Sequence, residues 1–470
     1  MDKKEFRKQG HIFVDWMADY LDSVEKLPVK SSIKPGEIYN ILNESPPEKG
    51  EEMDNIFADF KEKIIPGITH WQSPNFFAYF PANSSPASLL AEMLTATLGV
   101  QGMIWETSPA AAELEEKTMN WLKQMIGLPK GFEGVIQDTA STATLTAILT
   151  AREKKSEFSI NKKGFGNESY RIYCSTETHS SIEKAVKIAG FGKQNLVKVR
   201  TDGQFRMDSP ELEKAIQHDI SMGKIPLCIV ATLGTTGSTA IDPLKKIAEI
   251  SSKYNIWLHV DAAFAGTALI LDEFKWMIEG IEKADSFVFN PHKWMFTNFD
   301  CSAYFIKDKQ ALINTFAINP EYLRTQTQGQ VNDYRDWGIQ LGRRFRALKL
   351  WFVIRSFGVH GLQEKIRGHI SLAKWLEGEI NKSTSFEMLT PRTLNLICFR
   401  YKPLGVESLD ELNTINERVL HEVNQTGKVF ITHTKLNGAY SLRMVIGQTN
   451  VEKTHVEKAW KLVGEVASSL

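Results

Sequence analysis

The fold of this chain is decided by the stretch Ile256-Trp257-Leu258-His259-Val260-Asp261 and, further on, Ser286-Phe287-Val288-Phe289-Asn290-Pro291-His292-Lys293. Each run begins as a short apolar segment that predicts a buried strand. In an open α/β sheet, ligands bind outside the carboxyl ends of the strands. We therefore expect Asp261 and Lys293, about 32 residues apart, to point into one crevice.

The chemistry of this pair suggests a particular cofactor. A lysine in such a crevice can form a Schiff base with an aldehyde, and an acid across the crevice can hold a cationic ring nitrogen. Those are the two protein groups that pyridoxal phosphate requires. The alternative is that Asp261 caps a helix and Lys293 is a solvated surface residue. Such structural roles are common for either residue alone, but the occurrence of both residues with this flanking sequence favours the cofactor site.

The surrounding sequence predicts the class of fold. From about residue 134 to 306, short apolar runs alternate with helical stretches, which indicates a mainly parallel sheet with helices on both faces. The expected strands lie at 135–136, 172–174, 227–230, 256–260, 287–289 and 303–306. The stretch 315–335 has few periodic signals and suggests a mobile loop.

Three parts are expected along the chain. Residues 1–85 form an N-terminal helical segment whose two amphipathic stripes cannot bury their apolar faces alone. These helices must pack on the main body or on another subunit, and we favour a dimerisation interface. Residues 86–375 form a large α/β domain, and residues 376–470 a small α+β domain whose hairpin turns at Asn437-Gly438, a type I′ signature.

Composition narrows the function classes. Lys plus Arg equals Asp plus Glu, at 56 each, so nothing indicates a nucleic-acid or anionic-membrane partner. The four cysteines lack CxxC spacing and are expected to be buried thiols rather than disulfides or metal ligands, which fits a reducing cytoplasm. No segment approaches the length of a membrane span, and no secretory signal opens the chain. We therefore expect a cytoplasmic protein without a metal.

Further polar residues follow the predicted strands. Asp138-Thr139-Ala140-Ser141 lies between a strand and a helix, where backbone N–H groups can cradle a phosphate, although Ser and Thr also cap most helices. Polar residues follow several of the predicted strands, and this grouping favours a binding site over separate structural roles for each residue. The other strand-end residues are His179, Thr235, Thr236, Asn290 and His292.

Longer motifs resemble a known family. The segments 178–181, 259–263 and 290–294 are similar to those of the group II pyridoxal-phosphate decarboxylases, above all the aromatic-L-amino-acid decarboxylases. Segments 69–71, 76–81 and 341–346 extend the resemblance, which runs to about residue 370 and more loosely to the end. It implies a fold-type I, aminotransferase-like architecture and a homodimer with the active site at the subunit interface.

The resemblance also implies roles for single residues. Lys293 matches the lysine that carries pyridoxal phosphate, Asp261 the partner of its ring nitrogen, and His179 the imidazole stacked on its ring. Tyr322 matches the catalytic tyrosine of the mobile loop. The remaining cofactor positions are Ala140, Ser141 and Asn290 for the phosphate, Thr236 in support, and His292 beside the lysine.

The substrate pocket is expected to be apolar and suited to a planar side chain. Its predicted residues are Trp71, Tyr79, Phe80, Ala82, Met103, His179 and Gly342. For the aromatic residues and Met103, ordinary core packing is the alternative. The chain departs from the animal enzymes at Asp138 (glycine there), Ala82 (threonine) and Met103 (phenylalanine), which loosens the inference about the preferred ring.

The expected activity is decarboxylation of an aromatic L-amino acid: DOPA, tyrosine, tryptophan or 5-hydroxytryptophan. One alternative is an aromatic aldehyde synthase on the same scaffold. In the family this switch is linked to loss of the loop tyrosine or the stacking histidine, and Tyr322 and His179 are both present. Another is a non-catalytic homologue, which the joint presence of Lys293, Asp261, His179 and Tyr322 disfavours.

Overall fold

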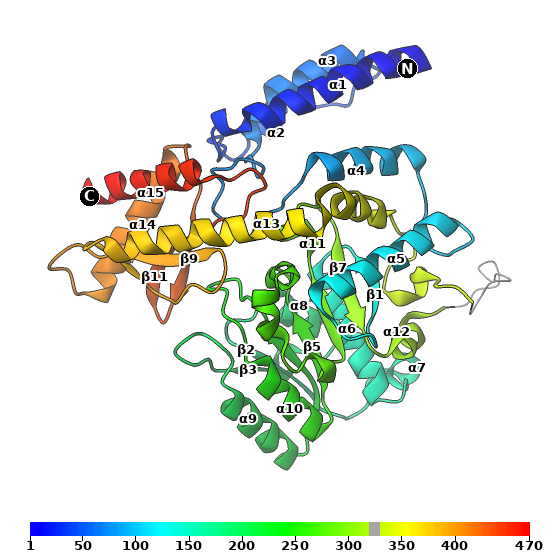
Figure 1. Ribbon diagram of the computed structural model, residues 1–470. Coiled ribbons are helices and arrows are strands. Elements are labelled where there is room, and N and C mark those ends of the chain that lie inside the picture. The colour runs from blue at the N-terminus through cyan, green and yellow to red at the C-terminus, as the bar shows by residue number, and fades with distance from the viewer. Residues whose placement is uncertain (319–329) are drawn as a thin grey trace. The chain divides into compact units, whose positions relative to one another are not determined.

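The computed structural model describes residues 1–318 and 330–470 (Figure 1). Its internal contacts divide the chain into two compact units. Unit 1 comprises Met1–Pro81, Ser371–Leu389 and Ile397–Leu470, and unit 2 comprises Ala82–Ile370 and Thr390–Leu396. The segments expected at the two ends of the chain thus fall largely within unit 1.

Unit 2 is built on a seven-stranded sheet with the strand order β1-β7-β6-β5-β4-β2-β3. The strands β2 through β6 pair in parallel, and β7 is antiparallel to both β1 and β6. The mainly parallel sheet is therefore confirmed. Its strands are β1 (Glu133–Gln137), β2 (Tyr170–Ser175), β3 (Leu196–Val199), β4 (Ile225–Thr232), β5 (Trp257–Asp261), β6 (Ser286–Phe289) and β7 (Ser302–Ile306).

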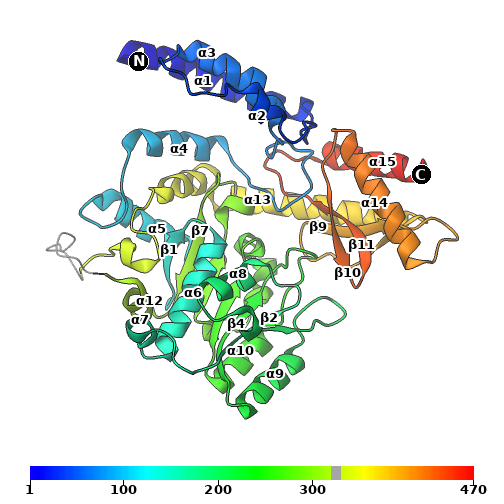
Figure 2. The ribbon, with the colours of Figure 1, turned by 180° about the vertical axis from the view of Figure 1, so that it is seen from behind.

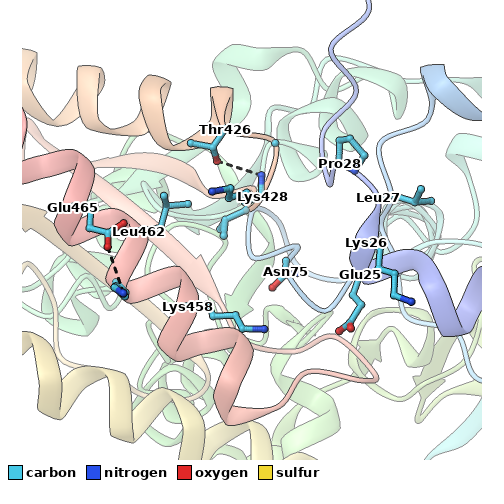
Figure 3. Close-up of a pocket in the computed structure, with 13 residues that line it drawn as sticks. Glu25, Lys26, Leu27, Pro28, Asn75, Thr426, Lys428, Lys458, Leu462 and Glu465 are labelled. Carbon is cyan, nitrogen blue, oxygen red and sulfur yellow. Dashed lines mark hydrogen bonds and ion pairs between the residues drawn. The ribbon is translucent and has the colours of Figure 1, made fainter.

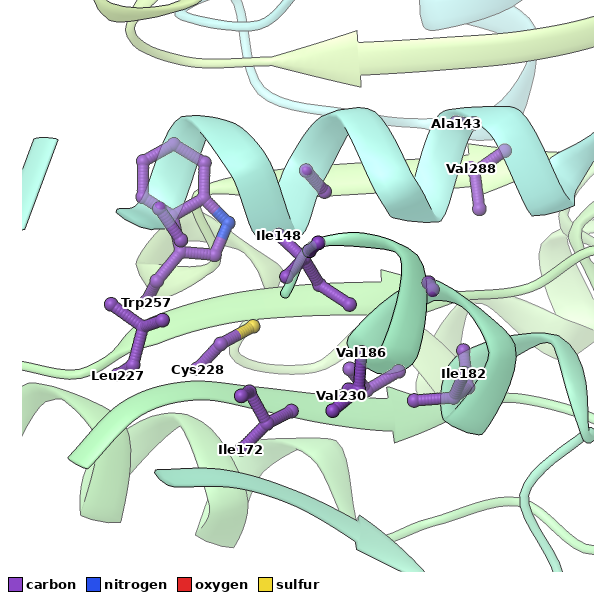
Figure 4. Packing of buried hydrophobic residues seen from close by; sticks show 14 of the residues in the cluster. Ala143, Ile148, Ile172, Ile182, Val186, Leu227, Cys228, Val230, Trp257 and Val288 are labelled. Carbon is purple, nitrogen blue, oxygen red and sulfur yellow. The ribbon is translucent and has the colours of Figure 1, made fainter. Parts of the chain in front are cut away.

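Helices lie on both sides of this sheet, as the two opposite views show (Figures 1 and 2). On one face, α6 (Ala140–Lys155) and α8 (Ser181–Ile188) cover the apolar strands (Figure 4). Ile148 of α6 and Val186 of α8 are fully buried there with Val230 of β4. The helices α9 (Ser209–Ser221) and α10 (Leu244–Tyr254) pack on each other and against β4. Burial of these apolar side chains fixes the strand ends in place.

The remaining helices of unit 2 are α4 (Pro86–Leu98), α5 (Pro109–Ile126), α7 (Ile160–Lys163), α11 (Pro291–Trp294) and α12 (Lys309–Phe316). Local sequence sets both ends of α5: the Ser108 side chain accepts the Ala111 N–H, Pro109 takes the first helical position, and Gly127 ends the helix with φ +77°. The helix α13 (Arg346–Lys382) is interrupted at Gly358, where φ is +63°.

Unit 1 contains a four-stranded sheet with the order β10-β11-β9-β8 and a core of its own. The predicted hairpin turn is confirmed, since Asn437 and Gly438 have φ of +49° and +83°. The strands are β8 (Phe386–Met388), β9 (Leu396–Tyr401), β10 (Thr432–Leu436) and β11 (Ala439–Val445). The helices are α1 (Lys3–Ser23), α2 (Glu37–Ile41), α3 (Met53–Asp59), α14 (Leu409–Gln425) and α15 (Lys453–Ser468).

The structure contains elements that the sequence pattern did not predict, among them α2, α4, β3 and β8. It also corrects the far end of the expected loop 315–335, because Tyr334–Trp337 forms a 3-10 turn in which Tyr334 and Trp337 are buried. Residues 319–329 lie outside the described part. Among the described residues, no helix has the length and apolar character needed to span a membrane.

Candidate active site

The parallel strands of unit 2 deliver the predicted residues to one edge of the sheet. Asp261 is the last residue of β5, Lys293 follows β6, and His179 follows β2. Because β2, β4, β5 and β6 are parallel neighbours, their carboxyl ends lie at the same edge. The observed topology therefore brings Asp261, Lys293 and His179 to the same edge of the sheet.

The electrostatics of His179 place it near both charged residues. Partial burial lowers the pKa of its imidazole, the Lys293 ammonium lowers this pKa further, and the Asp261 carboxylate opposes the shift. Such effects require the two charges to lie close to the ring. The His179 side chain also remains accessible to solvent, so a face of the ring is available to a ligand.

Hydrogen bonding orients the His179 ring. Its Nδ1 accepts the Ser181 backbone N–H at 3.2 Å and lies 2.8 Å from the Ser181 hydroxyl. A nitrogen that accepts from a backbone N–H carries no proton, which assigns the proton of the neutral ring to Nε2. His179 can therefore present an Nε2–H donor toward the crevice.

Asp261 is a buried acid and Lys293 a half-buried base. Asp261 is 5% exposed, and its Oδ1 accepts the Ala263 N–H at 3.0 Å. Lys293 lies on the short helix α11, and its backbone N–H bonds the Asn290 carbonyl at 2.9 Å. A buried carboxylate favours a cationic partner such as a protonated ring nitrogen.

Asn290 and His292 flank the lysine and are buried. The Asn290 Oδ1 accepts the Ser302 hydroxyl at 2.6 Å, and among the described residues no partner binds its amide nitrogen. The His292 Nδ1 accepts the Cys301 N–H at 2.8 Å, and burial lowers the pKa of His292 to about 3. His292 is therefore neutral and, like Asn290, offers an N–H donor beside Lys293.

The predicted phosphate turn opens α6. The Thr139 side chain caps this helix by accepting the Thr142 N–H, which leaves the first-turn N–H groups of Ala140 and Ser141 without helical partners. Ser141 is exposed, and its hydroxyl has no partner in the described chain. A helix N-terminus with these free donors suits a phosphate dianion.

Asp138, which precedes this turn, is bound within the protein. Its Oδ1 accepts the Thr139 N–H at 2.6 Å and its Oδ2 accepts from Gln340 at 2.8 Å. Although desolvation opposes the shift, hydrogen bonds from Thr142, Thr139 and Gln340 hold the pKa of this carboxyl below its usual value. Asp138 is therefore an ionised neighbour of the turn whose oxygens already have donors.

The two threonines after β4 differ in their availability. The Thr235 hydroxyl is buried, lies 3.1 Å from the Ser238 hydroxyl and accepts the Ala240 N–H at the same distance. Thr236 is exposed. Thr236 is thus exposed to solvent, whereas the Thr235 hydroxyl is bonded within the core.

The predicted substrate residues are divided between the units. Ala82, Met103 and Gly342 belong to unit 2, whereas Trp71, Tyr79 and Phe80 belong to unit 1. Within unit 1, Trp71 and Tyr79 stack at 5.8 Å, and they are 37% and 50% exposed. Core packing therefore does not account for these two rings. Phe80 lies beneath the Arg443 guanidinium at 5.1 Å. Tyr322 falls outside the described residues.

The residues of unit 2 fit pyridoxal phosphate. The first N–H groups of α6 lack helical partners, Asp261 is a buried acid, Lys293 and Asp261 both act on the His179 ring, and His179 is exposed. Ala140, Ser141 and Asn290 would hold the phosphate, Asp261 the ring nitrogen and Lys293 the aldehyde carbon. Among the described residues, no cluster of His, Cys, Asp and Glu could hold a metal ion.

A separate hollow of about 490 Å³ occurs within unit 1 (Figure 3). Lys26, Lys428, Lys458 and Lys461 line it together with two glutamates. No predicted site residue lines this hollow, so it is not the predicted site.

Two functional candidates were not predicted: Glu115 and Arg343. Both are charged yet nearly fully buried, and they form an ion pair of 2.6 Å next to the end of β1. The sequence feature that could have revealed this pair is Glu115 itself, a charged residue on the face of α5 that is otherwise buried.

The chain is similar to known proteins over its whole length. The pyridoxal-dependent decarboxylase conserved domain matches residues 35–402. Tyrosine decarboxylase 4 of Petroselinum crispum is 44% identical over 484 residues, covering 100% of this chain and 94% of the relative. Phenylacetaldehyde synthase of Arabidopsis thaliana is 43% identical over 480 residues, covering 100% and 97%. A crystal structure of the Oryza sativa protein TDC with PLP and tryptamine has a TM-score of 0.97 at 34% identity, covering 100% and 99%.

Proposed function

The chain belongs to the pyridoxal-dependent decarboxylase family, and from that premise we propose that it decarboxylates an aromatic L-amino acid to the amine and CO2. The expected substrates are DOPA, tyrosine, tryptophan and 5-hydroxytryptophan. The observation that carries the proposal is the grouping of Lys293, Asp261 and His179 at the carboxyl ends of parallel strands. The names of the relatives, which include tyrosine decarboxylases, support the aromatic class.

Each residue has a distinct task in this reaction. When bound, pyridoxal phosphate supplies an electron sink for the negative charge that remains at Cα as CO2 leaves. Lys293 would hold the cofactor covalently, and the Asp261 carboxylate would keep the ring nitrogen protonated. His179 would pack on the ring and orient the substrate. The Tyr322 hydroxyl would donate the proton to Cα.

The active site is expected to be completed by a second copy of the chain. In unit 2, the helix α4 exposes the apolar side chains of Leu90, Met93, Leu94 and Leu98. In unit 1, Phe6 and Ile56 are also exposed. Apolar side chains exposed together in this way support burial in a homodimer. The four buried free cysteines support a cytoplasmic location.

An aromatic aldehyde synthase is the second candidate, favoured by the similarity to phenylacetaldehyde synthase. The two activities differ in whether Cα is protonated before oxygen reaches it. Incubation with an aromatic amino acid in air separates them: a decarboxylase yields amine without oxygen uptake, and an aldehyde synthase yields aldehyde, ammonia and peroxide.

Tyr322→Phe tests the proposed proton donor. The variant should bind pyridoxal phosphate and release CO2, but amine formation should fall by about 10²–10⁴-fold because the general acid is lost. Aldehyde and peroxide should appear in its place. Amine at the unmodified rate with no oxygen uptake would assign the proton to another residue, with His179 the leading candidate.

A further inference from the structure

Three consecutive residues, the last two of β1 and Asp138 directly after it, are hydrogen-bonded to one distant segment, residues 337–343. These three residues lead directly into the phosphate turn at 139–141. The bonds are Arg343 Nη2 to the Ile136 carbonyl at 2.8 Å, Gln137 Nε2 to the Trp337 carbonyl at 3.0 Å, and Gln340 Nε2 to Asp138 Oδ2 at 2.8 Å. The approach to the phosphate turn is therefore held from one side by this segment.

A buried ion pair anchors the contact. Glu115 of α5 is 4% exposed and Arg343 is 6% exposed, and Arg343 Nη2 lies 2.6 Å from Glu115 Oε1. The same Oε1 accepts the Ile136 N–H at 2.8 Å. Both backbone polar groups of Ile136 are thus bonded to the ion pair.

Arg343 also reaches the segment that carries Met103. Its Nη1 donates to the Gly102 carbonyl at 3.2 Å, and its own carbonyl accepts the Gly102 N–H at 2.9 Å. The Arg343 guanidinium also packs on the Tyr334 ring, whose centre lies 5.0 Å away. The pair therefore bonds Ile136, three residues before the turn expected to bind phosphate. It also lies next to two residues of the expected aromatic pocket, because Gly342 directly precedes Arg343 and Met103 directly follows Gly102.

Stability alone is a weak reason for such a pair. Burying two charges costs desolvation energy that their attraction only offsets, and apolar residues of similar size often serve as well. Directional hydrogen bonds are what the pair provides, and Arg343 has a planar fork of donors that can bind several oxygens at once. Here those donors reach Glu115, Ile136 and Gly102.

We propose that the Glu115–Arg343 ion pair is a positioning device of the active site. It fixes the phosphate turn and the segments of Met103 and Gly342 relative to one another. It therefore sets both the affinity for the cofactor phosphate and the fit of the aromatic substrate. This role rests on the proposed function, because it presupposes pyridoxal phosphate at the turn after β1.

The test compares binding of pyridoxal phosphate with binding of pyridoxal, which lacks the phosphate. Arg343→Lys keeps the charge opposite Glu115 but cannot reach all three partners with one ammonium group. The preference for the phosphorylated ligand should fall about tenfold in the apo-protein of this variant, with pyridoxal affinity unchanged. The KM for the aromatic substrate should rise more than kcat falls, because Met103 and Gly342 are displaced.

Glu115→Gln is the companion variant and should lower the same preference. The matched control is the exposed Arg367–Glu273 pair, which is also in unit 2 with a distance of 2.7 Å. Arg367→Lys and Glu273→Gln should leave binding and KM unchanged. If Glu115→Gln fails to fold, the phosphate preference and KM of Arg343→Lys test the proposal.

A folded Arg343→Lys protein with unmodified phosphate preference and KM would overturn the proposal, even if its melting temperature fell, because the pair would then be structural only. Failure of the unmodified protein to bind pyridoxal phosphate or release CO2 would instead contradict the proposed function. The two failures are thus distinguishable.

Discussion

Burial keeps two histidines of unit 2 neutral. His259 is fully buried, with Thr144 Oγ1 at 3.1 Å and Ser286 Oγ at 2.9 Å, and desolvation lowers its pKa to about 3. His292 beside Lys293 is lowered to about the same value. The pKa of a histidine in an unfolded chain is about 6.5, so below that pH each of these two histidines takes up a proton when the protein unfolds.

The pH dependence of stability follows from this difference. The contribution of each histidine is fully present above about pH 6.5 and is lost as pH falls toward about 3, at roughly 1.4 kcal/mol per pH unit. Urea unfolding of His259→Gln over this range should show a shallower loss of the free energy of unfolding than the unmodified protein. His218→Gln, at an exposed position, is the control and should keep the original slope. An unchanged slope in His259→Gln would mean that His259 is already protonated when folded.

The charge of Asp261 is the second property that a single substitution can test. Asp261→Asn keeps the size and the acceptor for the Ala263 N–H but removes the charge. Pyridoxal phosphate affinity should fall by about ten- to a hundredfold, because the amide cannot hold a protonated ring nitrogen, and most CO2 release should be lost. Cofactor titration and CO2 assays measure both quantities, with the exposed Asp272→Asn as control. Near-normal turnover in Asp261→Asn would make the acid purely structural.

At the scale of elements, the helix α4 shows that the spacing of apolar residues does not always identify the buried face of a helix. It buries Ser88, Ala91 and Thr95 and exposes Leu90, Leu94 and Leu98, so its apolar residues do not mark the face that the chain itself covers. The usable signal was local: Ser85 caps the helix in a capping box, and Pro86 follows at the first position. The edge strand β3 was missed for a related reason, because three of its four residues are not fully buried.

We expect the exposed face of α4 to be covered in the proposed homodimer. Leu94→Glu would place a charge in that contact, so the variant should sediment as a monomer and lose CO2 release, since the site is expected at the interface. Leu404→Glu is the matched control, because Leu404 is fully exposed in a loop. A dimeric, active Leu94→Glu protein would exclude α4 from the interface.

At the scale of the molecule, the central sheet could be predicted because its buried strands are continuous apolar runs. The rule that ligands bind at strand ends then placed Lys293, Asp261 and His179 without structural knowledge. Glu115 and Arg343 could not be paired in this way. They are 228 residues apart, and their contact depends on how α5 and the segment before α13 pack around β1.

The central claim is that the Lys293 crevice decarboxylates aromatic L-amino acids. The most direct measurement is CO2 release and amine formation from a panel of L-amino acids, by the protein loaded with pyridoxal phosphate and by Lys293→Ala. We predict equal amounts of CO2 and amine from tyrosine, tryptophan, DOPA or 5-hydroxytryptophan, poor turnover of histidine and glutamate, and almost none with Lys293→Ala. Faster turnover of histidine or glutamate than of every aromatic substrate, or undiminished release by Lys293→Ala, would contradict it.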